Sequence, residues 1–381
     1  MKTIRFCTLF FGVLIIACES QVDSIDHRIG LLQLEALPQV VDPVTNESTA
    51  AKQILGRSLF FDPILSGNKD IACATCHIPI RGYADGIDLS IGVGGRGLAE
   101  KRTDLSGGSI SIIGRNSQTI INTAFNGLIS SHECNDPRIA PMFWDGRKKS
   151  LEDQTTGPIT SFNEMRGSIY TATVAYDSIV SRLKNIAEYR ALFTDAFGSP
   201  DSINESNISK AIAAFERTIL STNSPYDRFI RGDKEALSPQ QKTGLLLFFG
   251  KANCATCHSG PMLSDYNYYN LGIPFNPKRA DPDKGVNSQF LFRTPSLRNV
   301  ELTAPYMHNG MFPTLQSVVM HYVNAKSQNP SINYIDPKVQ PLDLTQDEVN
   351  AIIDFLNSLT DARYDQEIPT RVPSGLTPAG N

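Results

Sequence analysis

Several features that mark other protein classes are missing from this chain of 381 residues. It has no run of five charges of one sign and a net charge of only −4, so a nucleic-acid-binding surface is not expected. After the first seventeen residues, no stretch is long and apolar enough to form a transmembrane helix. Alternating strand and helix patterns are absent too, and the 27 glycines and 23 prolines predict long loops. We therefore expect a mostly helical globular protein.

The chain begins with a short targeting signal. Lys2 and Arg5 precede an apolar run, residues 6–17, that is too short to span a bilayer. The run leads into Cys18 and resembles a bacterial lipoprotein signal, in which the chain is cut before the cysteine and the cysteine carries lipid. The alternative is an ordinary secretory signal that is cut a few residues later. Both place the mature protein in the periplasm or cell envelope, and the first anchors it by lipid at Cys18.

Composition and periodicity divide the chain. Residues 1–17 are the signal, 18–48 a polar tether, 49–200 and 201–361 two domains, and 362–381 a Pro-rich tail. Residues between the helices are rich in glycine and short polar side chains, which indicates irregular loops. Apolar residues at helical spacing predict helices over 50–61, 150–154, 171–197, 207–220, 238–250 and 345–359. Asp62-Pro63 ends the first of these helices, and Thr345, with Glu348 in the first turn, begins the last.

Four of the seven cysteines stand in two identical pentapeptides, Cys-Ala-Thr-Cys-His, at 73–77 and 254–258. Cys-x-x-Cys-His is the attachment signature of c-type haem. Residues i and i+3 share one side of a helical turn, so two thiols reach one porphyrin, and the following His presents an imidazole to the iron. A redox dithiol or half a zinc site would use the thiols, but neither needs the repeated His. The expected haem-binding residues are Cys73, Cys76, His77, Cys254, Cys257 and His258.

Five motifs resemble the bacterial dihaem cytochrome c peroxidase and MauG family. They are LGRSLFFDPILSGNKDIACATCH, GYADG, FWDGR, AFERTILSTNSPYDRF and FRTPSLRNVELTAPYMHNG, and the likeness runs from Leu55 to Leu359. The resemblance implies a mostly α fold with two cytochrome c-like domains, each holding one covalently bound haem, joined at an interface. It also implies that the N-terminal haem reacts with peroxide and that the C-terminal haem relays electrons.

The resemblance assigns roles to four residues near the N-terminal haem. Gln154, Pro158 and Glu164 match the distal pocket, and Glu164 would be the general acid–base that moves a proton between the peroxide oxygens. In a water-poor haem pocket, the pKa of this carboxyl should be raised. Trp144 matches the residue that carries electrons between the haems. Without the resemblance, Glu164 would be interpreted as part of an exposed turn and Trp144 as a core aromatic at a domain interface.

A calcium site at the domain junction is also implied. Asn116 would supply its side chain, and Thr303 and Pro305 their backbone carbonyls, which together make a hard-cation site completed by water. Family members often form homodimers, and their electron donors are small cytochromes or other redox proteins.

The sequence departs from ordinary family members at two positions. Many peroxidases have a His sixteen residues after the first pentapeptide, and it blocks the peroxide haem until the protein is reduced. This chain has Val93 there, which cannot bind iron, so we expect an N-terminal haem that is open at rest. At the C-terminal haem, Tyr322 stands where peroxidases have Met, as in MauG; a tyrosinate stabilises higher iron oxidation states. The competing ligands are Met307, Met311, Met320 and His321, of which His321 is turned about 100° from Tyr322 on a helix.

An insert at residues 127–141 contains His132 and Cys134. We interpret it as a surface loop, although a movement of His132 could close the open haem.

Three functions compete. The leading hypothesis is a peroxidase that reduces hydrogen peroxide to water with electrons from a redox protein. The second is a MauG-like oxidase that modifies a partner protein. The third is a dihaem electron carrier without peroxide chemistry, which requires two six-coordinate irons and is disfavoured by Val93 and Glu164.

Overall fold

The structure is a computed structural model that describes residues 25–105, 107, 112–133 and 136–380. The targeting signal with Cys18, and Cys134 of the insert, lie outside the described residues, so the predictions about them stay predictions. None of the helices in the described ranges has the length and apolar character needed to cross a bilayer.

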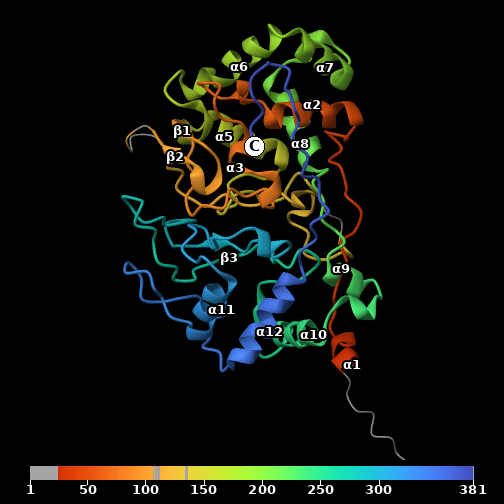
Figure 1. The fold of residues 1–381 in the computed structure, drawn as a ribbon, viewed down its shortest axis with the longest axis vertical. Helices are drawn as coiled ribbons and strands as arrows, with labels where there is room; N and C mark the ends of the chain where they lie inside the picture. The colour runs from red at the N-terminus through yellow and green to blue at the C-terminus, as the bar shows by residue number, and fades with distance from the viewer. Residues whose placement is uncertain (1–24, 106, 108–111, 134–135, 381) are drawn as a thin grey trace, which may run out of the picture.

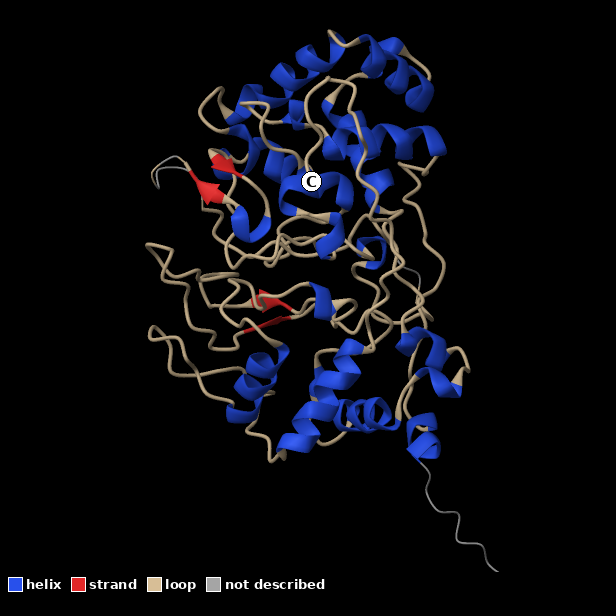
Figure 2. Ribbon diagram, viewed as in Figure 1, coloured by secondary structure: helices blue, strands red, loops and turns tan. Residues whose placement is uncertain are grey.

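Helices and long loops make up most of the chain, and the only strands in the described residues form two short antiparallel pairs (Figure 2). The strand pairs are β1 (Gly95–Arg96) with β2 (Thr103–Asp104), and β3 (Tyr268–Tyr269) with β4 (Phe292–Arg293). The α-helices are α1 (Ile25–Gly30), α2 (Ala50–Phe61), α3 (Cys73–Cys76), α4 (Leu151–Gln154), α5 (Thr156–Thr160), α6 (Ala175–Lys184), α7 (Ala187–Phe197), α8 (Glu205–Glu216), α9 (Pro225–Ile230), α10 (Pro239–Phe249), α11 (Leu315–Asn324) and α12 (Gln346–Asn357). This confirms the prediction of a mostly α protein.

Two helix crossings of the same construction form the centres of the two halves (Figure 1). In the first half, α2 crosses α8 so closely that a Cβ on Gly56 would lie 1.9 Å from the carbonyl oxygen of Ala211. In the second half, α10 crosses α12, and a Cβ on Gly244 would lie 1.9 Å from the carbonyl oxygen of Ala351. Glycine is therefore required at both crossings, and each half has its own apolar core around one of them.

The first and last described segments each pack on the more distant half. At the N-terminal end, α1 lies against α10, where Asp26 forms an ion pair with Lys242 at 2.9 Å. At the other end, residues 362–380 run back over the first half, as Figure 1 shows for the blue end of the chain. There, Ser374 Oγ donates a hydrogen bond to Asp62 Oδ1 at 2.7 Å. The crossed ends tie the two halves together.

The structure contains the predicted helices, with one difference. The segment predicted as one helix over 171–197 is two, α6 and α7, because α6 ends at Asn185, whose N–H bonds back to the carbonyl of Arg182. Thr345 begins α12 as predicted: its side chain accepts a hydrogen bond from the N–H of Glu348, and the carboxylate of Glu348 accepts one from the N–H of Thr345.

Candidate active site

A continuous cavity of about 860 Å³ lies between the two halves. It is lined from both sides, and its wall includes every residue of the two pentapeptides that was predicted to hold haem. These lining residues are Cys73, Cys76, His77, Cys254, Cys257 and His258. The structure therefore brings two sequence motifs, far apart in the chain, to one cavity.

The first pentapeptide forms the short helix α3, and His77 follows at its C-terminal end. Nδ1 of His77 lies 3.0 Å from the carbonyl oxygen of Tyr83, so this nitrogen carries the proton and Nε2 keeps its lone pair. Burial lowers the pKa of His77 and keeps the ring neutral. A neutral imidazole with a fixed Nε2 is the form that binds a metal.

The second pentapeptide has the same construction on a tighter turn. Residues Cys254–Thr256 form a 3-10 turn, and Nδ1 of His258 lies 2.9 Å from the carbonyl oxygen of Leu263. Burial lowers the pKa of His258 as well. Both halves thus present one oriented, neutral imidazole to the cavity.

The chemistry of these residues fits covalently bound haem. All four cysteines are unpaired, and burial raises the pKa of Cys76 to about 12, so they are neutral thiols available for thioether bonds. Within the described part of the chain, no group of three or more His, Cys, Asp or Glu residues could hold a metal ion, which argues against a zinc site. A redox dithiol needs a thiolate of lowered pKa, whereas burial raises the pKa of these thiols.

Three predicted distal residues line the same cavity. Gln154 ends α4, Pro158 lies in α5, and Glu164 lies on a single π-helical turn, Phe162–Arg166. Burial raises the pKa of Glu164, while Arg147 opposes the shift. The structure therefore places Glu164 in the cavity wall rather than on an exposed turn.

The turn that carries Glu164 is held by the segment around Val93. The N–H of Val93 donates to the carbonyl oxygen of Asn163 at 3.0 Å. A Cβ on Gly92 would lie 1.9 Å from that same oxygen, so the close approach requires glycine. Val93 itself is 3% exposed, packs against Gly167 and does not line the cavity.

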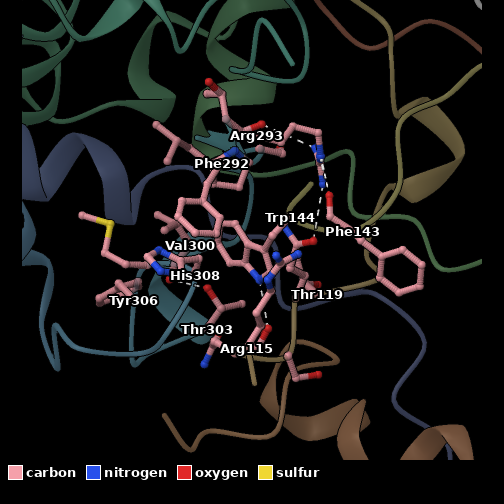
Figure 3. A pocket seen from close by; sticks show the side chains of 18 of the residues that line it. Arg115, Thr119, Phe143, Trp144, Phe292, Arg293, Val300, Thr303, Tyr306 and His308 are labelled. Carbon is pink, nitrogen blue, oxygen red and sulfur yellow. Dashed lines mark hydrogen bonds between the residues drawn. The ribbon is translucent and has the colours of Figure 1, made fainter. Parts of the chain in front are cut away.

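Trp144 lies in an aromatic cluster between the two halves (Figure 3). Its Nε1 donates to the carbonyl oxygen of Asn116 at 3.0 Å, and its ring meets His308 edge to face at 6.5 Å between centroids. The ring of His308 stacks on Phe292 at 3.6 Å, and burial lowers the pKa of His308 to about 3. His308 and Phe292 were not among the predicted site residues; they belong to the FRTPSLRNVELTAPYMHNG motif, whose letters do not reveal this contact.

Tyr322 lines the cavity from α11, and the neighbouring His321 does not. Both ring nitrogens of His321 are engaged elsewhere: Nε2 lies 2.8 Å from the carbonyl oxygen of Leu271, and Nδ1 lies 3.0 Å from Nε2 of Gln328. Burial raises the pKa of the Tyr322 phenol, and a bound cation would act in the opposite direction.

The three methionines near Tyr322 differ in position. Met307 lines the cavity, whereas Met311 and Met320 do not, and Met320 packs against the core of the second half. Of the five predicted candidate ligands, Tyr322 and Met307 are therefore the two that line the cavity.

The remaining predicted residues divide into two groups. Asn116, Thr303 and Pro305 all line the cavity, and the side-chain amide of Asn116 donates to the carbonyl oxygen of Ile87 at 2.9 Å. His132 lies on an exposed loop outside the cavity wall.

Paired attachment motifs around one cavity define a c-type dihaem protein, and comparisons with known proteins agree. The family model for di-haem cytochrome c peroxidase matches residues 50–235. The methylamine utilization protein MauG of Methylorubrum extorquens is 32% identical over 344 residues, which cover 89% of this chain and 86% of the relative. Cytochrome-c peroxidase IdrP1 of Denitromonas iodatirespirans is 34% identical over 362 residues, or 86% of each chain.

Solved structures agree on the fold. A MauG-like protein associated with microbial copper homeostasis has a TM-score of 0.69 at 28% identity, with 85% of this chain and 95% of that chain covered. The diheme peroxidase BthA of Burkholderia thailandensis has a TM-score of 0.65 at 23% identity, covering 91% and 98%. The chain belongs to the di-haem cytochrome c peroxidase family. Its cofactors are accordingly two covalently bound c-type haems, carried by two cytochrome c-like domains.

Proposed function

We propose that this protein is a peroxidase that reduces hydrogen peroxide to water at the N-terminal haem, with electrons from a redox protein. The observation that carries the proposal is the carboxyl of Glu164, which lies in the wall of the cavity that His77 also lines. An electron carrier has no need of a proton-transferring carboxyl at this place. When bound, the haem supplies the iron that coordinates peroxide and delivers electrons.

Glu164 moves the proton. In peroxide reduction one oxygen must lose a proton and the other must gain one before the O–O bond breaks, and a carboxyl with a raised pKa can do both. Gln154 can donate an amide hydrogen bond to the bound peroxide, and Pro158 contributes apolar wall that excludes water. Two electrons and two protons convert one peroxide into two waters.

The resting protein needs no reductive activation. The position that carries a blocking His in many peroxidases is Val93, which has no metal-binding atom and packs against Gly167 outside the cavity. Electrons reach this half from the second half through Trp144, whose ring lies between the halves in contact with His308. Tyr322 would hold the iron of the second haem together with His258, and Met307 is its competitor.

One observation favours a second candidate function. Tyr322 lines the cavity, and a tyrosine that held the iron of the second haem would suit a MauG-like oxidase that keeps oxidising equivalents and modifies a side chain of a partner protein. The two functions differ in the substrate that is oxidised: a small redox protein in the first, and an amino-acid side chain in the second.

Several finer properties belong to the same proposal. The N-terminal signal supports a periplasmic or cell-envelope location with a lipid anchor at Cys18. The presence of Asn116, Thr303 and Pro305 among the residues that line the cavity supports a calcium ion at the junction of the halves. A homodimer is proposed from the resemblance alone.

Low-temperature EPR of the oxidised holoprotein tests the proposal. We expect one high-spin ferric signal, from the open His77 haem, and one low-spin signal, from the His258 haem. Addition of peroxide should then change the high-spin signal without prior reduction, and a small cytochrome should be oxidised in turn. Two low-spin signals, with no reaction until reduction, would overturn the open resting state. A reaction with peroxide that oxidises no cytochrome but modifies a partner protein would favour the second function.

A further inference from the structure

Glu216, the last residue of α8, is a second carboxyl in the cavity wall. It is 5% exposed and makes no side-chain hydrogen bond or ion pair with any described residue. Burial of a carboxylate without a partner is costly, so such a residue needs either a proton or a positive charge from another source. The mechanism above uses Glu164 and leaves Glu216 without a role.

The neighbouring cation is already neutralised. Arg217 donates to both oxygens of Glu152, at 2.8 and 3.0 Å, and its side chain is 2% exposed. This bidentate pair satisfies the guanidinium charge within the first half. Arg217 therefore lowers the pKa of Glu216 only in part, and Glu152 raises it.

Within the described residues, the basic side chains of α2 are engaged elsewhere. On α2, Arg57 pairs with Asp365 across the tail, and Lys52 donates to the carbonyl oxygen of Glu47 at 2.7 Å. The remaining titratable groups near this part of α8 are neutral or acidic: Cys73 of α3, Tyr176 of α6, and Asp153 of α4, which pairs with Lys148. Burial raises the pKa of Glu216 to about 8 in this surrounding.

We propose that Glu216 is a redox-linked proton site, which takes up one proton when the haem attached at Cys73 and Cys76 accepts one electron. The electron comes from the donor protein and the proton from solvent; both leave when the haem is oxidised again. The reason is electrostatic. A ferric haem core carries one more positive charge than a ferrous core, so it favours the ionised carboxylate, and its reduction favours the protonated acid.

Burial favours Glu216 over Glu164 for this role, because Glu216 is 5% exposed and Glu164 is only half-buried. Each carboxyl is near an attachment cysteine: the charge of Glu216 raises the pKa of Cys73, and the charge of Glu164 raises the pKa of Cys76. Storage of a proton with each electron would keep the net charge of the buried site nearly constant. The stored proton and electron could then both be used in peroxide reduction.

The midpoint potential of each haem, measured by spectroelectrochemistry at a series of pH values without peroxide, tests this proposal. In the wild-type holoprotein we expect the midpoint potential of the N-terminal haem to fall by about 59 mV per pH unit, the value for one proton taken up with one electron. This slope should hold at pH values between the pKa of Glu216 in the oxidised protein and its pKa in the reduced protein. Glu216→Gln should abolish this slope. Glu205→Gln, an exposed position on the same helix, should keep it.

Two results would overturn the proposal: an unchanged slope in Glu216→Gln, or loss of the slope in Glu164→Gln. If Glu216→Gln does not fold with haem, reduced-minus-oxidised infrared spectra decide. A protonated carboxyl band that appears on reduction and survives in Glu164→Gln supports Glu216, and absence of the band contradicts it. Because no peroxide is present, failure of the proposed peroxidase activity would leave this result intact.

Discussion

The two halves share a scaffold and differ in what they present opposite the histidine. Each has a glycine at its central helix crossing, Gly56 and Gly244, and each orients its pentapeptide His through Nδ1. In the cavity wall, the first half adds Glu164, the proposed acid–base residue, and the second adds the phenol of Tyr322. The shared scaffold thus presents one oriented histidine from each half, and the segments that follow place different side chains in the cavity wall.

The largest effect should come from removing the acid–base group of the first half. Glu164→Gln keeps the size of the side chain but cannot carry the proton, so we expect peroxide turnover to fall by about 10²–10⁴-fold with haem content unchanged. Steady-state oxidation of a reduced cytochrome measures this. Glu188→Gln, on the surface of α7, serves as control, and full activity in Glu164→Gln would refute the assigned role.

A substitution in the second half tests whether Tyr322 makes the two halves differ. Tyr322→Phe removes the oxygen that faces the cavity, so the second haem should lose its low-spin EPR signal and resemble the first. Met307→Leu is the matched control on the same cavity wall and should leave the spectrum unchanged. The reverse outcome, with the low-spin signal lost only in Met307→Leu, would transfer the ligand role to Met307.

The shared scaffold can be tested at its two crossings. An added methyl group at Gly56 or Gly244 would stand 1.9 Å from a backbone oxygen, so Gly56→Ala and Gly244→Ala should each lower the free energy of unfolding by about 1–3 kcal/mol. Chemical denaturation of the holoproteins measures both. Gly30→Ala, where the added methyl meets open space, is the control. A large loss at one crossing alone would show that the halves are not energetically equivalent.

The smallest effect concerns pH. Burial raises the pKa of Glu164, and the residue must be ionised to accept the first proton from peroxide. Activity should therefore fall as the pH drops through this raised pKa, at a higher pH than for an ordinary carboxyl. The pH profile of kcat/KM measures the position of this acid limb, and the limb should be missing from the residual activity of Glu164→Gln.

Local signals in the sequence predicted most helices and both attachment sites. Thr345 with Glu348 marked the start of α12, and Asp62 with Pro63 marked the end of α2, because capping and proline act within one turn. The break between α6 and α7 has no glycine or proline to announce it. The burial of Glu216 and its lack of a partner depend on contacts between α8 and distant segments, which no local pattern contains.

The resemblance to a family predicted cavity residues that the spacing of residues in the sequence could not predict. No periodicity connects Gln154, Pro158 and Glu164 with the first pentapeptide, yet the structure brings all three to the cavity that His77 lines. The resemblance did not predict the stack of His308 on Phe292, because that contact depends on the three-dimensional positions of both rings.

The crossed ends of the chain have a consequence for the order of assembly. Residues 362–380 are synthesised after both pentapeptides, yet they cover the first half, and Gly380 lies so near Ala74 that an added Cβ would be 3.4 Å from its methyl group. The first half therefore cannot be completed while the chain is still being made. Until that last segment arrives, the helix bearing Cys73 and Cys76 is left uncovered on this side.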